Sequence, residues 1–342
     1  MNLHKFPRRG YVKTPTPIEY LPRLTRALDA GIEVYVKRDD LLPGTLGGNK
    51  TRKLDFSVAK ALSQGADALV TSGAVQSNHC RLTLAWAIRE GLECHLIIEE
   101  RVPDSYDPHG SGNNFLFNLL GAAGLTVVPG NADIQAETQA AAEALRKKGK
   151  KPFIIPGGAA DPVGALGYAA CAQEIGDQML WGQNDFSHVV CASGSGGTQA
   201  GLLAGFSALS TPIEVIGINV RRAKREDQRE VIKSLTDRTL ALLDLNYLID
   251  DSRVICYENF LGPGYSLAAP ATLEAVRLLA RTEAILVDPV YTGKALAGLL
   301  GLAREGFFPR GAKVLFLHTG GAPALFSYLS SFPEVAGSGF KA

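Results

Sequence analysis

The sequence lacks an excess of charge of either sign. Its 342 residues include 35 Lys and Arg against 34 Asp and Glu, which leaves a formal net charge of +1 at pH 7. A nucleic-acid backbone is bound through a positive field that neutralises its phosphates, so we expect no nucleic-acid partner. Only 20% of the residues are charged and 46% are hydrophobic, and this composition excludes a disordered chain.

Long apolar runs are lacking as well. The hydrophobic stretches are short and are broken by Gly, Pro or charge, so we expect no transmembrane helix and no membrane partner. The first nine residues, Met-Asn-Leu-His-Lys-Phe-Pro-Arg-Arg, contain no apolar core of a secretion signal. The five cysteines are scattered, with no CxxC pair and no His/Cys spacing typical of zinc. We therefore expect a reduced, cytoplasmic protein without a metal site.

The sequence does contain a regular alternation of helical and strand-like segments, which is typical of helices on both faces of a parallel sheet. The predicted strands are 66–72, 93–99, 125–128, 152–156, 188–191, 214–220, 254–257, 285–288 and 313–318. The predicted helices are 51–64, 77–90, 113–120, 134–148, 163–179, 198–209, 224–243, 273–282 and 294–305. Two such series in a chain of this length predict an α/β fold of two open, twisted lobes with a ligand cleft between them.

The segment Gly47-Gly48-Asn49-Lys50 stands at the start of a predicted helix. One interpretation is a glycine-rich turn with an exposed lysine. The other follows from the helix dipole, which disfavours a cation at this end. A lowered pKa of the Lys50 amine would suit a lysine that attacks a carbonyl group, because only the neutral amine is a nucleophile.

The segment Ser193-Gly194-Ser195-Gly196-Gly197-Thr198 lies between a predicted strand and a predicted helix. Glycines allow backbone N–H groups to converge, hydroxyls add donors, and the helix dipole favours an anion. No lysine follows the last glycine as it does in a P-loop, and the spacing GxGxxG is absent. The segment therefore suits a single monophosphate group, the alternative being a merely flexible loop.

Other loops at strand ends carry polar side chains. Ser77 and Asn78 could either cap a helix or bind a carboxylate. His318 could be a buried core histidine or a catalyst, and Tyr265 could be a turn aromatic or an active-site residue. A reactive lysine with a monophosphate site implies pyridoxal phosphate, the phosphate-bearing aldehyde cofactor. The competing motifs GxSxG and HExxH are absent.

Five motifs, in order along the chain, resemble one family. They are GGNKTRKL at 47–54, QSN at 76–78, GSGGTQAG at 194–201, DPVY at 288–291 and HTGGAPAL at 318–325. From about residue 3 to about residue 330 the sequence resembles the aminocyclopropane-carboxylate deaminase / D-cysteine desulfhydrase family of pyridoxal-phosphate enzymes, which have the fold-type II, tryptophan-synthase-β-like architecture. The resemblance implies a homodimer, with the cofactor in the cleft of each chain. It also implies a large domain of residues 1–50 plus 161–342 and a small inserted domain of residues 51–160.

The resemblance assigns roles to individual residues. Lys50 would form the Schiff base with the cofactor, and Asn49 would bond the phenolic oxygen of the cofactor. The phosphate would be bound by Gly194, Ser195, Gly196, Gly197 and Thr198. The substrate would be bound by Gln76, Ser77, Asn78, Tyr265 and Tyr291, of which Ser77 and the two tyrosines would also be catalytic. Either Lys50 or Ser77 would remove the α-proton of the substrate.

Thr292 and Thr319 stand where the deaminases of this family have Glu and Leu. A carboxylate partner would keep the pyridine nitrogen of the cofactor protonated, as the opening of an unactivated cyclopropane needs. A hydroxyl partner leaves that nitrogen neutral, which suffices when a good leaving group departs from Cβ. The aminocyclopropane substrate is therefore disfavoured.

The predicted reaction is β-elimination from a small sulfur-containing amino acid, which gives pyruvate and ammonia. D-cysteine, releasing sulfide, is the expected substrate, and L-cysteate, releasing sulfite, is the alternative. L-cysteine and β-chloroalanine are further possibilities. Arg101, His79 and Arg222 are candidates to meet a sulfonate.

Two different functions are weighed against this reaction. A racemase or dehydratase of the same fold would carry much the same motifs, and the identity of its product would distinguish it. A binding protein that kept the fold without the chemistry would be indicated by loss of Lys50 or of the glycine-rich phosphate segment. Both are present in this sequence, so an enzyme is favoured.

Overall fold

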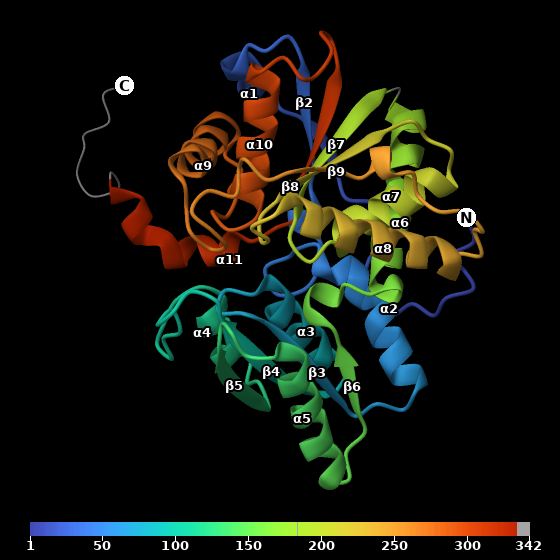
Figure 1. Ribbon diagram of the computed structural model, residues 1–342, viewed down its shortest axis with the longest axis vertical. Coiled ribbons are helices and arrows are strands. Elements are labelled where there is room, and N and C mark those ends of the chain that lie inside the picture. The colour runs from blue at the N-terminus through green and yellow to red at the C-terminus, as the bar shows by residue number, and fades with distance from the viewer. Residues whose placement is uncertain (183, 334–342) are drawn as a thin grey trace.

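Two β-sheets, each flanked by helices, organise the chain (Figure 1). The computed structural model describes residues 1–182 and 184–333. Over these residues the larger sheet has the strand order β1-β2-β10-β7-β8-β9, and the smaller sheet has the order β5-β4-β3-β6. Strand β1 pairs with β2 in the antiparallel sense, and the other pairings between described strands are parallel. The predicted two-lobed α/β fold with mostly parallel sheets is confirmed.

The smaller sheet is buried on both faces. Its strands are β3 (Ala68–Ala74), β4 (Glu93–Glu100), β5 (Gly124–Pro129) and β6 (Pro152–Ile155). Helices α2 (Lys50–Ser63), α3 (Asn78–Arg89) and α4 (Asn113–Leu119) cover one face, and α5 (Ile134–Lys147) covers the other. Leu69 packs in the core under the three helices, whereas Ala68 and Val70 pack against α5. Both alternate positions of the strand are apolar because both faces are covered.

The larger sheet repeats this arrangement. Its strands are β1 (Ile18–Tyr20), β2 (Glu33–Lys37), β7 (Phe186–Ser193), β8 (Glu214–Asn219), β9 (Ile255–Tyr257) and β10 (Lys313–Leu317). Helices α1 (Pro22–Leu28), α9 (Pro270–Glu283) and α10 (Thr292–Arg304) cover one face, and α6 (Pro162–Gly182), α7 (Gly197–Ala208) and α8 (Arg225–Leu242) cover the other. The short helix α11 (Ala322–Leu325) follows β10. Each sheet therefore has an apolar core on both of its faces, and a further cluster packs Phe56 of α2 against Leu166 of α6.

One predicted strand is wrong. Residues 285–288 form no strand, although Ile285 and Val287 are buried in the core of the larger lobe. The segment instead lies beside the sheet as an extended loop, and the Leu286 carbonyl accepts a hydrogen bond of 2.9 Å from His318 Nε2. A short apolar run signals burial, but it does not reveal whether a neighbouring strand is within reach. The N-terminal elements β1, α1 and β2 are additions to the sequence-based prediction.

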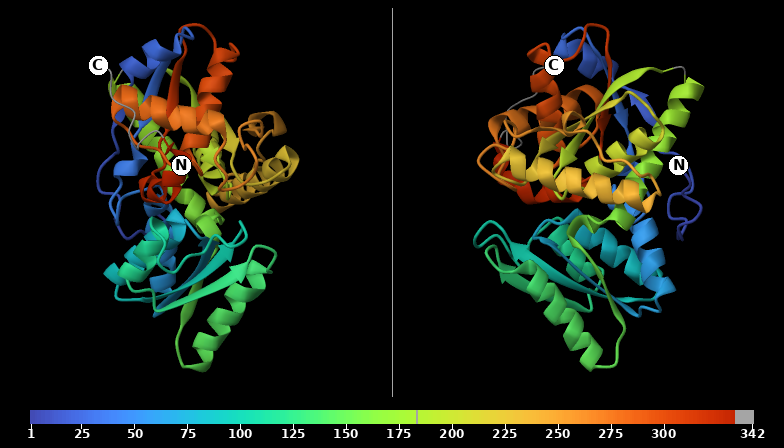
Figure 2. Two further views of the ribbon diagram at one scale, coloured as in Figure 1. Left: turned by 90° about the vertical axis from the view of Figure 1, so that its left-hand side faces the viewer. Right: turned by 45° about the vertical axis from the view of Figure 1, so that its right-hand side comes forward.

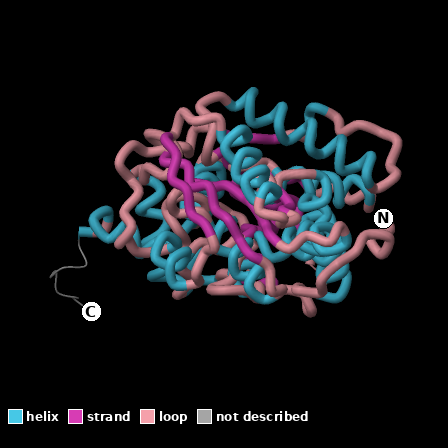
Figure 3. Tube along the Cα trace, turned by 90° about the horizontal axis from the view of Figure 1, so that it is seen from below, coloured by secondary structure: helices cyan, strands magenta, loops and turns pink. Residues whose placement is uncertain are grey.

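The chain enters the smaller lobe through α2 and returns to the larger one after β6, as the change from blue to green in Figure 1 shows. Two turned views show the smaller lobe below the larger one (Figure 2), and a view from below shows the strands as a twisted array among helices (Figure 3). We therefore propose the division of residues 1–50 plus 161–342 against 51–160. None of the described helices is long and apolar enough to cross a membrane.

Candidate active site

A cavity of about 200 Å³ lies between the two lobes, at the carboxyl ends of the parallel strands of both sheets. Open α/β sheets bind their ligands at this edge, because the loops that follow the strands converge there. The predicted site residues that line the cavity are Asn49, Lys50, Ser77, Asn78, Gly194, Ser195, Gly196, Thr198, Tyr265, Tyr291 and Thr319. Gln76, Gly197 and Thr292 do not line it. The fold thus brings together residues spread over 270 positions of sequence.

Lys50 is the first residue of α2 and faces the cavity. Its Nζ donates a hydrogen bond of 3.0 Å to Asn49 Oδ1, and Asn49 Nδ2 donates one of 3.0 Å to Thr198 Oγ1. Burial lowers the pKa of Lys50 from its ordinary value of 10.5 to about 8; Asp288 opposes this shift and Arg81 adds to it. An appreciable fraction of the amine is therefore neutral near pH 7, as a nucleophilic lysine requires.

The glycine-rich segment after β7 forms a cup at the start of α7. Gly196 is the N-cap residue and has a φ of +86°, which favours glycine, so the chain can turn sharply into the helix. A Cβ atom placed on Gly197 would lie only 2.9 Å from Lys53 Nζ. The backbone N–H groups of the first helical turn have no partner within the helix, and together with the Lys53 amine they suit a phosphate.

Lys53 is a cofactor-site candidate that the sequence analysis missed. Its side chain is fully buried and donates one hydrogen bond of 3.2 Å, to the Gly158 carbonyl. Burial lowers the pKa of Lys53 well below its usual value, and the nearby Lys50 adds to this effect. A phosphate dianion beside it would offset both. The signal was present in the sequence, because residues three apart, such as Lys50 and Lys53, lie on one face of a helix.

The loop after β3 serves two purposes. Ser77 caps α3, since its Oγ accepts a hydrogen bond of 3.1 Å from the Cys80 backbone N–H, and it also lines the cavity. Asn78 lies beside it at the helix N-terminus, where the dipole favours a carboxylate. The Gln76 side chain turns the other way: its Oε1 accepts from the Asn113 backbone N–H at 2.8 Å, and its Nε2 donates to the Ser111 carbonyl. Gln76 thereby supports the start of α4.

Tyr265 and Tyr291 lie on another side of the cavity, and their hydroxyl groups are hydrogen bonded to each other. Burial raises the pKa of both phenols above the ordinary value, so both are neutral and able to donate a proton. The turn that carries Tyr265 is held by Lys294, whose Nζ donates to the Leu261 and Gly264 carbonyls at 2.7 and 2.6 Å.

The two threonines that separate the subfamilies are placed differently. Thr319 lines the cavity. Thr292 is buried behind it, where its Oγ1 donates a hydrogen bond of 2.7 Å to Asp288 Oδ2. The other oxygen of Asp288 accepts from the backbone N–H groups of Val290 and Tyr291, at 2.8 and 2.7 Å. Asp288 thus orders the loop that carries Tyr291, and it does not face the cavity.

The polar candidates outside the motifs divide into two groups. Arg101 and His79 line the cavity, whereas Arg222 does not; its neighbour Arg221 does so instead. The Nε2 of His79 lies 2.7 Å from Thr71 Oγ1, and its buried Nδ1 has no partner among the described residues. His318 is a buried core histidine outside the cavity, because both its ring nitrogens are occupied by backbone groups, those of Leu286 and Gly320.

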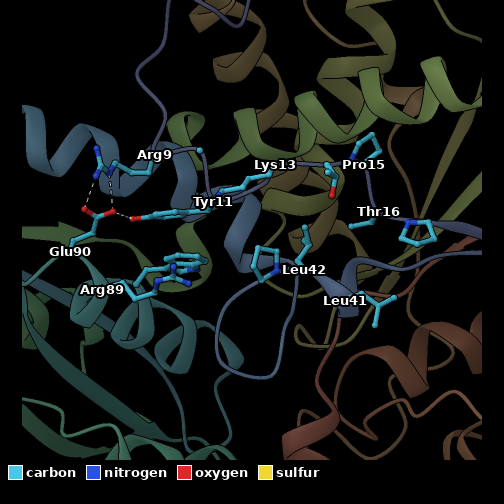
Figure 4. A pocket seen from close by; sticks show the side chains of 14 residues that line it. Arg9, Tyr11, Lys13, Pro15, Thr16, Leu41, Leu42, Arg89 and Glu90 are labelled. Atoms are coloured by element: carbon cyan, nitrogen blue, oxygen red, sulfur yellow. Dashed lines mark hydrogen bonds and ion pairs between the residues drawn. The ribbon is translucent and has the colours of Figure 1, made fainter.

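A larger hollow of about 620 Å³ lies beside the N-terminal segment and contains none of the predicted site residues (Figure 4). Two of its polar side chains share one carboxylate, since Arg9 pairs with Glu90 at 2.8 Å and the Tyr11 hydroxyl donates to Glu90 at 2.7 Å. The Tyr11 ring stacks on Trp86, with centroids 3.6 Å apart. Lys50 does not line this hollow; it lines the cavity between the lobes.

The fold is that of an α/β enzyme, and its cavity is lined by a buried lysine of lowered pKa and by a glycine-rich helix start. The chain belongs to the pyridoxal-phosphate-dependent enzyme family, whose family model matches residues 11–320. It is 42% identical over 329 residues to the D-cysteine desulfhydrase of Salmonella paratyphi C (strain RKS4594), covering 96% of this chain and 98% of that protein. The predicted cofactor and enzyme class are thereby confirmed.

Solved structures agree with this placement. A crystal structure of an ACC deaminase homologue has a TM-score of 0.87 and 36% sequence identity, with 97% of each chain covered. An O-ureido-L-serine synthase has a TM-score of 0.67 and 20% identity, covering 95% of this chain and 94% of that one. The second likeness extends to the fold alone.

Proposed function

We propose that this protein is a β-eliminating lyase that converts D-cysteine and water to pyruvate, sulfide and ammonia. The observation that carries the proposal is that no Asp or Glu is among the described residues that line the cavity. Asp288, whose charge raises the pKa of Lys50, does not line the cavity, and its carboxylate accepts from Thr292 and from the backbone of Val290. Without a carboxylate for the pyridine nitrogen, departure of a good leaving group from Cβ is favoured over opening of a cyclopropane ring. The relative named D-cysteine desulfhydrase supports the same choice.

The residues of the cavity fit pyridoxal phosphate. Lys50 would hold it covalently, and Asn49 would bond its phenolic oxygen. Gly194, Ser195, Gly196, Gly197 and Thr198 would hold the phosphate, and Lys53, whose Nζ would lie 2.9 Å from a Cβ on Gly197, would become charged beside it. When bound, the cofactor supplies an electron sink that stabilises negative charge at Cα.

The remaining residues would bind the substrate and move protons. Ser77 and Asn78, at the N-terminus of α3, would hold the α-carboxylate, because backbone N–H groups and the helix dipole favour an anion there. Lys50 or Ser77 would accept the α-proton, since both line the same cavity. Tyr265 and Tyr291 are neutral phenols and would donate a proton to the departing sulfur. The 2-aminoacrylate that is released hydrolyses in water to pyruvate and ammonia.

By analogy with the family, we also propose that the protein is a homodimer in the cytoplasm. Gel filtration with light scattering would test the assembly. A monomer at micromolar concentration would contradict it.

The function is tested by product analysis of the purified holoenzyme with four substrates: D-cysteine, L-cysteine, L-cysteate and aminocyclopropane carboxylate. We expect release of pyruvate from D-cysteine at the highest kcat/KM, and its loss in Lys50→Ala together with the visible absorption of the bound cofactor. Lys147→Ala, at the exposed end of α5, is the matched control. Release of 2-oxobutanoate from the cyclopropane as the main activity would overturn the argument from the missing carboxylate.

A further inference from the structure

Lys294 is a buried cation that is bound by backbone carbonyl groups. Its side chain is fully buried, and its Nζ donates hydrogen bonds of 2.7 Å to the Leu261 carbonyl and 2.6 Å to the Gly264 carbonyl. Among the described residues no carboxylate forms an ion pair with it. Lys294 also lies in the first turn of α10, where the helix dipole disfavours a cation. Both features make this charge costly to bury.

Lys294 connects the two segments that carry the active-site tyrosines. Tyr291 is the N-cap residue of α10 and precedes Lys294 by less than one helical turn, whereas Tyr265 directly follows Gly264, whose carbonyl Lys294 binds. The hydroxyl groups of Tyr265 and Tyr291 are hydrogen bonded to each other, and their ring centroids lie 6.0 Å apart. The ammonium group therefore fixes the relative position of two short segments that are 26 residues apart in the sequence.

The segment that carries Tyr265 depends on such bonds, because it has no regular secondary structure. Residues 258–269, all of which the structure describes, form neither helix nor strand. Ser266 has a φ of +63°, a strained conformation for a residue with a side chain. The Tyr328 hydroxyl donates a hydrogen bond of 2.8 Å to the Ser266 carbonyl. Lys294 and Tyr328 thus hold this loop on either side of Tyr265.

The surroundings make Tyr265 the better proton donor of the two phenols. Burial raises the pKa of both. The Arg101 guanidinium, 4.6 Å from the centroid of the Tyr265 ring, opposes this shift at Tyr265. The hydrogen bond between the hydroxyl groups lowers the pKa of Tyr265 and raises that of Tyr291. A Tyr265 phenolate would thus accept a hydrogen bond from Tyr291 and face a cation, so Tyr265 releases its proton more readily.

We propose that Lys294 is a positioning residue that holds Tyr265 against Tyr291, so that the Tyr265 phenol delivers a proton to the leaving group on Cβ. The inference rests on the proposed β-elimination. With D-cysteine, the α-proton passes to the base and the Cβ–S bond breaks. Its electron pair stays on sulfur, which takes the phenol proton. Tyr265 regains a proton from water after the product leaves, and neither oxidant nor reductant is consumed.

Two leaving groups that differ in their need for a proton test the proposal. Chloride leaves β-chloro-D-alanine as a stable anion, whereas departure of the sulfur of D-cysteine is assisted by protonation. In Lys294→Met, kcat for pyruvate release should fall at least about tenfold more with D-cysteine than with β-chloro-D-alanine, because only the first reaction uses the general acid. Lys294→Arg keeps the charge and should recover part of the loss. An equal fall with both substrates would show a merely structural role and overturn the proposal.

Lys233 provides the matched control. It also binds a backbone carbonyl, that of Ile249 at 3.0 Å, and it does not line the cavity. Lys233→Met should therefore leave the ratio of the two kcat values as in the wild type. A change of that ratio as large as in Lys294→Met would contradict the role given to Lys294.

A double-mutant comparison shows whether Lys294 acts through Tyr265. Tyr265→Phe should cause the same selective loss with D-cysteine, and adding Lys294→Met to it should lower kcat by less than about threefold. A further loss as large as in the wild-type background would overturn the proposal. Should Lys294→Met fail to bind the cofactor, Tyr328→Phe takes its place in the same comparison, since it removes the bond on the other side of the loop.

The position of Tyr265 is also measured without turnover. In holoenzyme labelled with carbon-13 at the tyrosine Cζ atoms, the Tyr265 resonance is assigned by its absence from Tyr265→Phe. Lys294→Met should move this resonance toward its position in Tyr291→Phe, which lacks the bond between the hydroxyl groups. An unmoved resonance would overturn the proposal. Absence of pyruvate from wild-type enzyme with either substrate would instead refute the proposed elimination, and the resonance would still decide whether Lys294 positions Tyr265.

Discussion

The Lys50 amine should react with the aldehyde of pyridoxal phosphate at a pH far below that of an ordinary lysine. Burial brings its pKa to about 8, against an ordinary value of 10.5. At pH 7 about one amine in ten is then neutral, compared with about one in three thousand for the ordinary lysine. Since only the neutral amine attacks, the site gains a factor of about 300 in reactive nucleophile.

The assay is the rate at which apoenzyme captures the cofactor, followed by its visible absorbance in stopped flow. The rate is measured from about pH 6.5, which is above the phosphate titration, to about pH 10.5. It should rise about tenfold per pH unit at first and level off near pH 8. Asp288→Asn should move the midpoint to lower pH, because the Asp288 carboxylate raises the pKa of Lys50. The amide oxygen can still accept the hydrogen bonds from the loop at residues 290 and 291.

A rate that keeps rising to pH 10 would refute the reasoning, because it would show that the Lys50 amine is solvated like a surface lysine. If Asp288→Asn moved the midpoint to higher pH, the inference that the Asp288 carboxylate raises the pKa of Lys50 would be refuted. Lys147→Ala should leave the profile unchanged, since Lys147 lies at the exposed end of α5.

Two further substitutions test the cup and the frame around it. In Gly197→Ala the new Cβ would lie 2.9 Å from Lys53 Nζ and 3.2 Å from the backbone Cα of Ala160. Lys53 would have to move away from the cup, so cofactor affinity in a titration should fall at least about tenfold. Gly176→Ala, with no contact closer than 4.0 Å, should bind the cofactor normally. Arg52→Met leaves the buried Asp39 without its partner at 2.8 Å and should cost about 3–5 kcal/mol in urea unfolding. The pKa of Asp39 is lowered despite burial, chiefly by Arg52, so wild type and variant should converge as the pH falls through that pKa. Normal cofactor affinity in the glycine variant, or an unfolding difference that grows in acid, would contradict these expectations.

The sequence predicted most of the elements because their signals are local. The run 68–70 is apolar at three consecutive positions, as expected when both faces of the strand are covered, and the strand lies between two helical segments. The strand predicted at 285–288 is absent because strand pairing is not a local property. The apolar composition of the segment indicates burial, but a strand forms only where a neighbouring strand is within hydrogen-bonding reach. The N-terminal strands β1 and β2 are too short to show a clear periodicity of hydrophobic residues, so the sequence did not predict them.

The sequence by itself determined the chemistry at each loop. A lysine at a helix start and glycines before a helix act through φ angles, N–H groups and the dipole, all of which lie within a few residues. Only the tertiary structure decided which of these groups share a cavity. It placed Lys53 against Gly197, turned Gln76 and Thr292 away, and brought Arg101 and Arg221 together from two lobes. These contacts join residues that are far apart in the sequence, so they depend on how the two sheets and their helices pack. The burial of each side chain and the pairing of its charge follow from that packing.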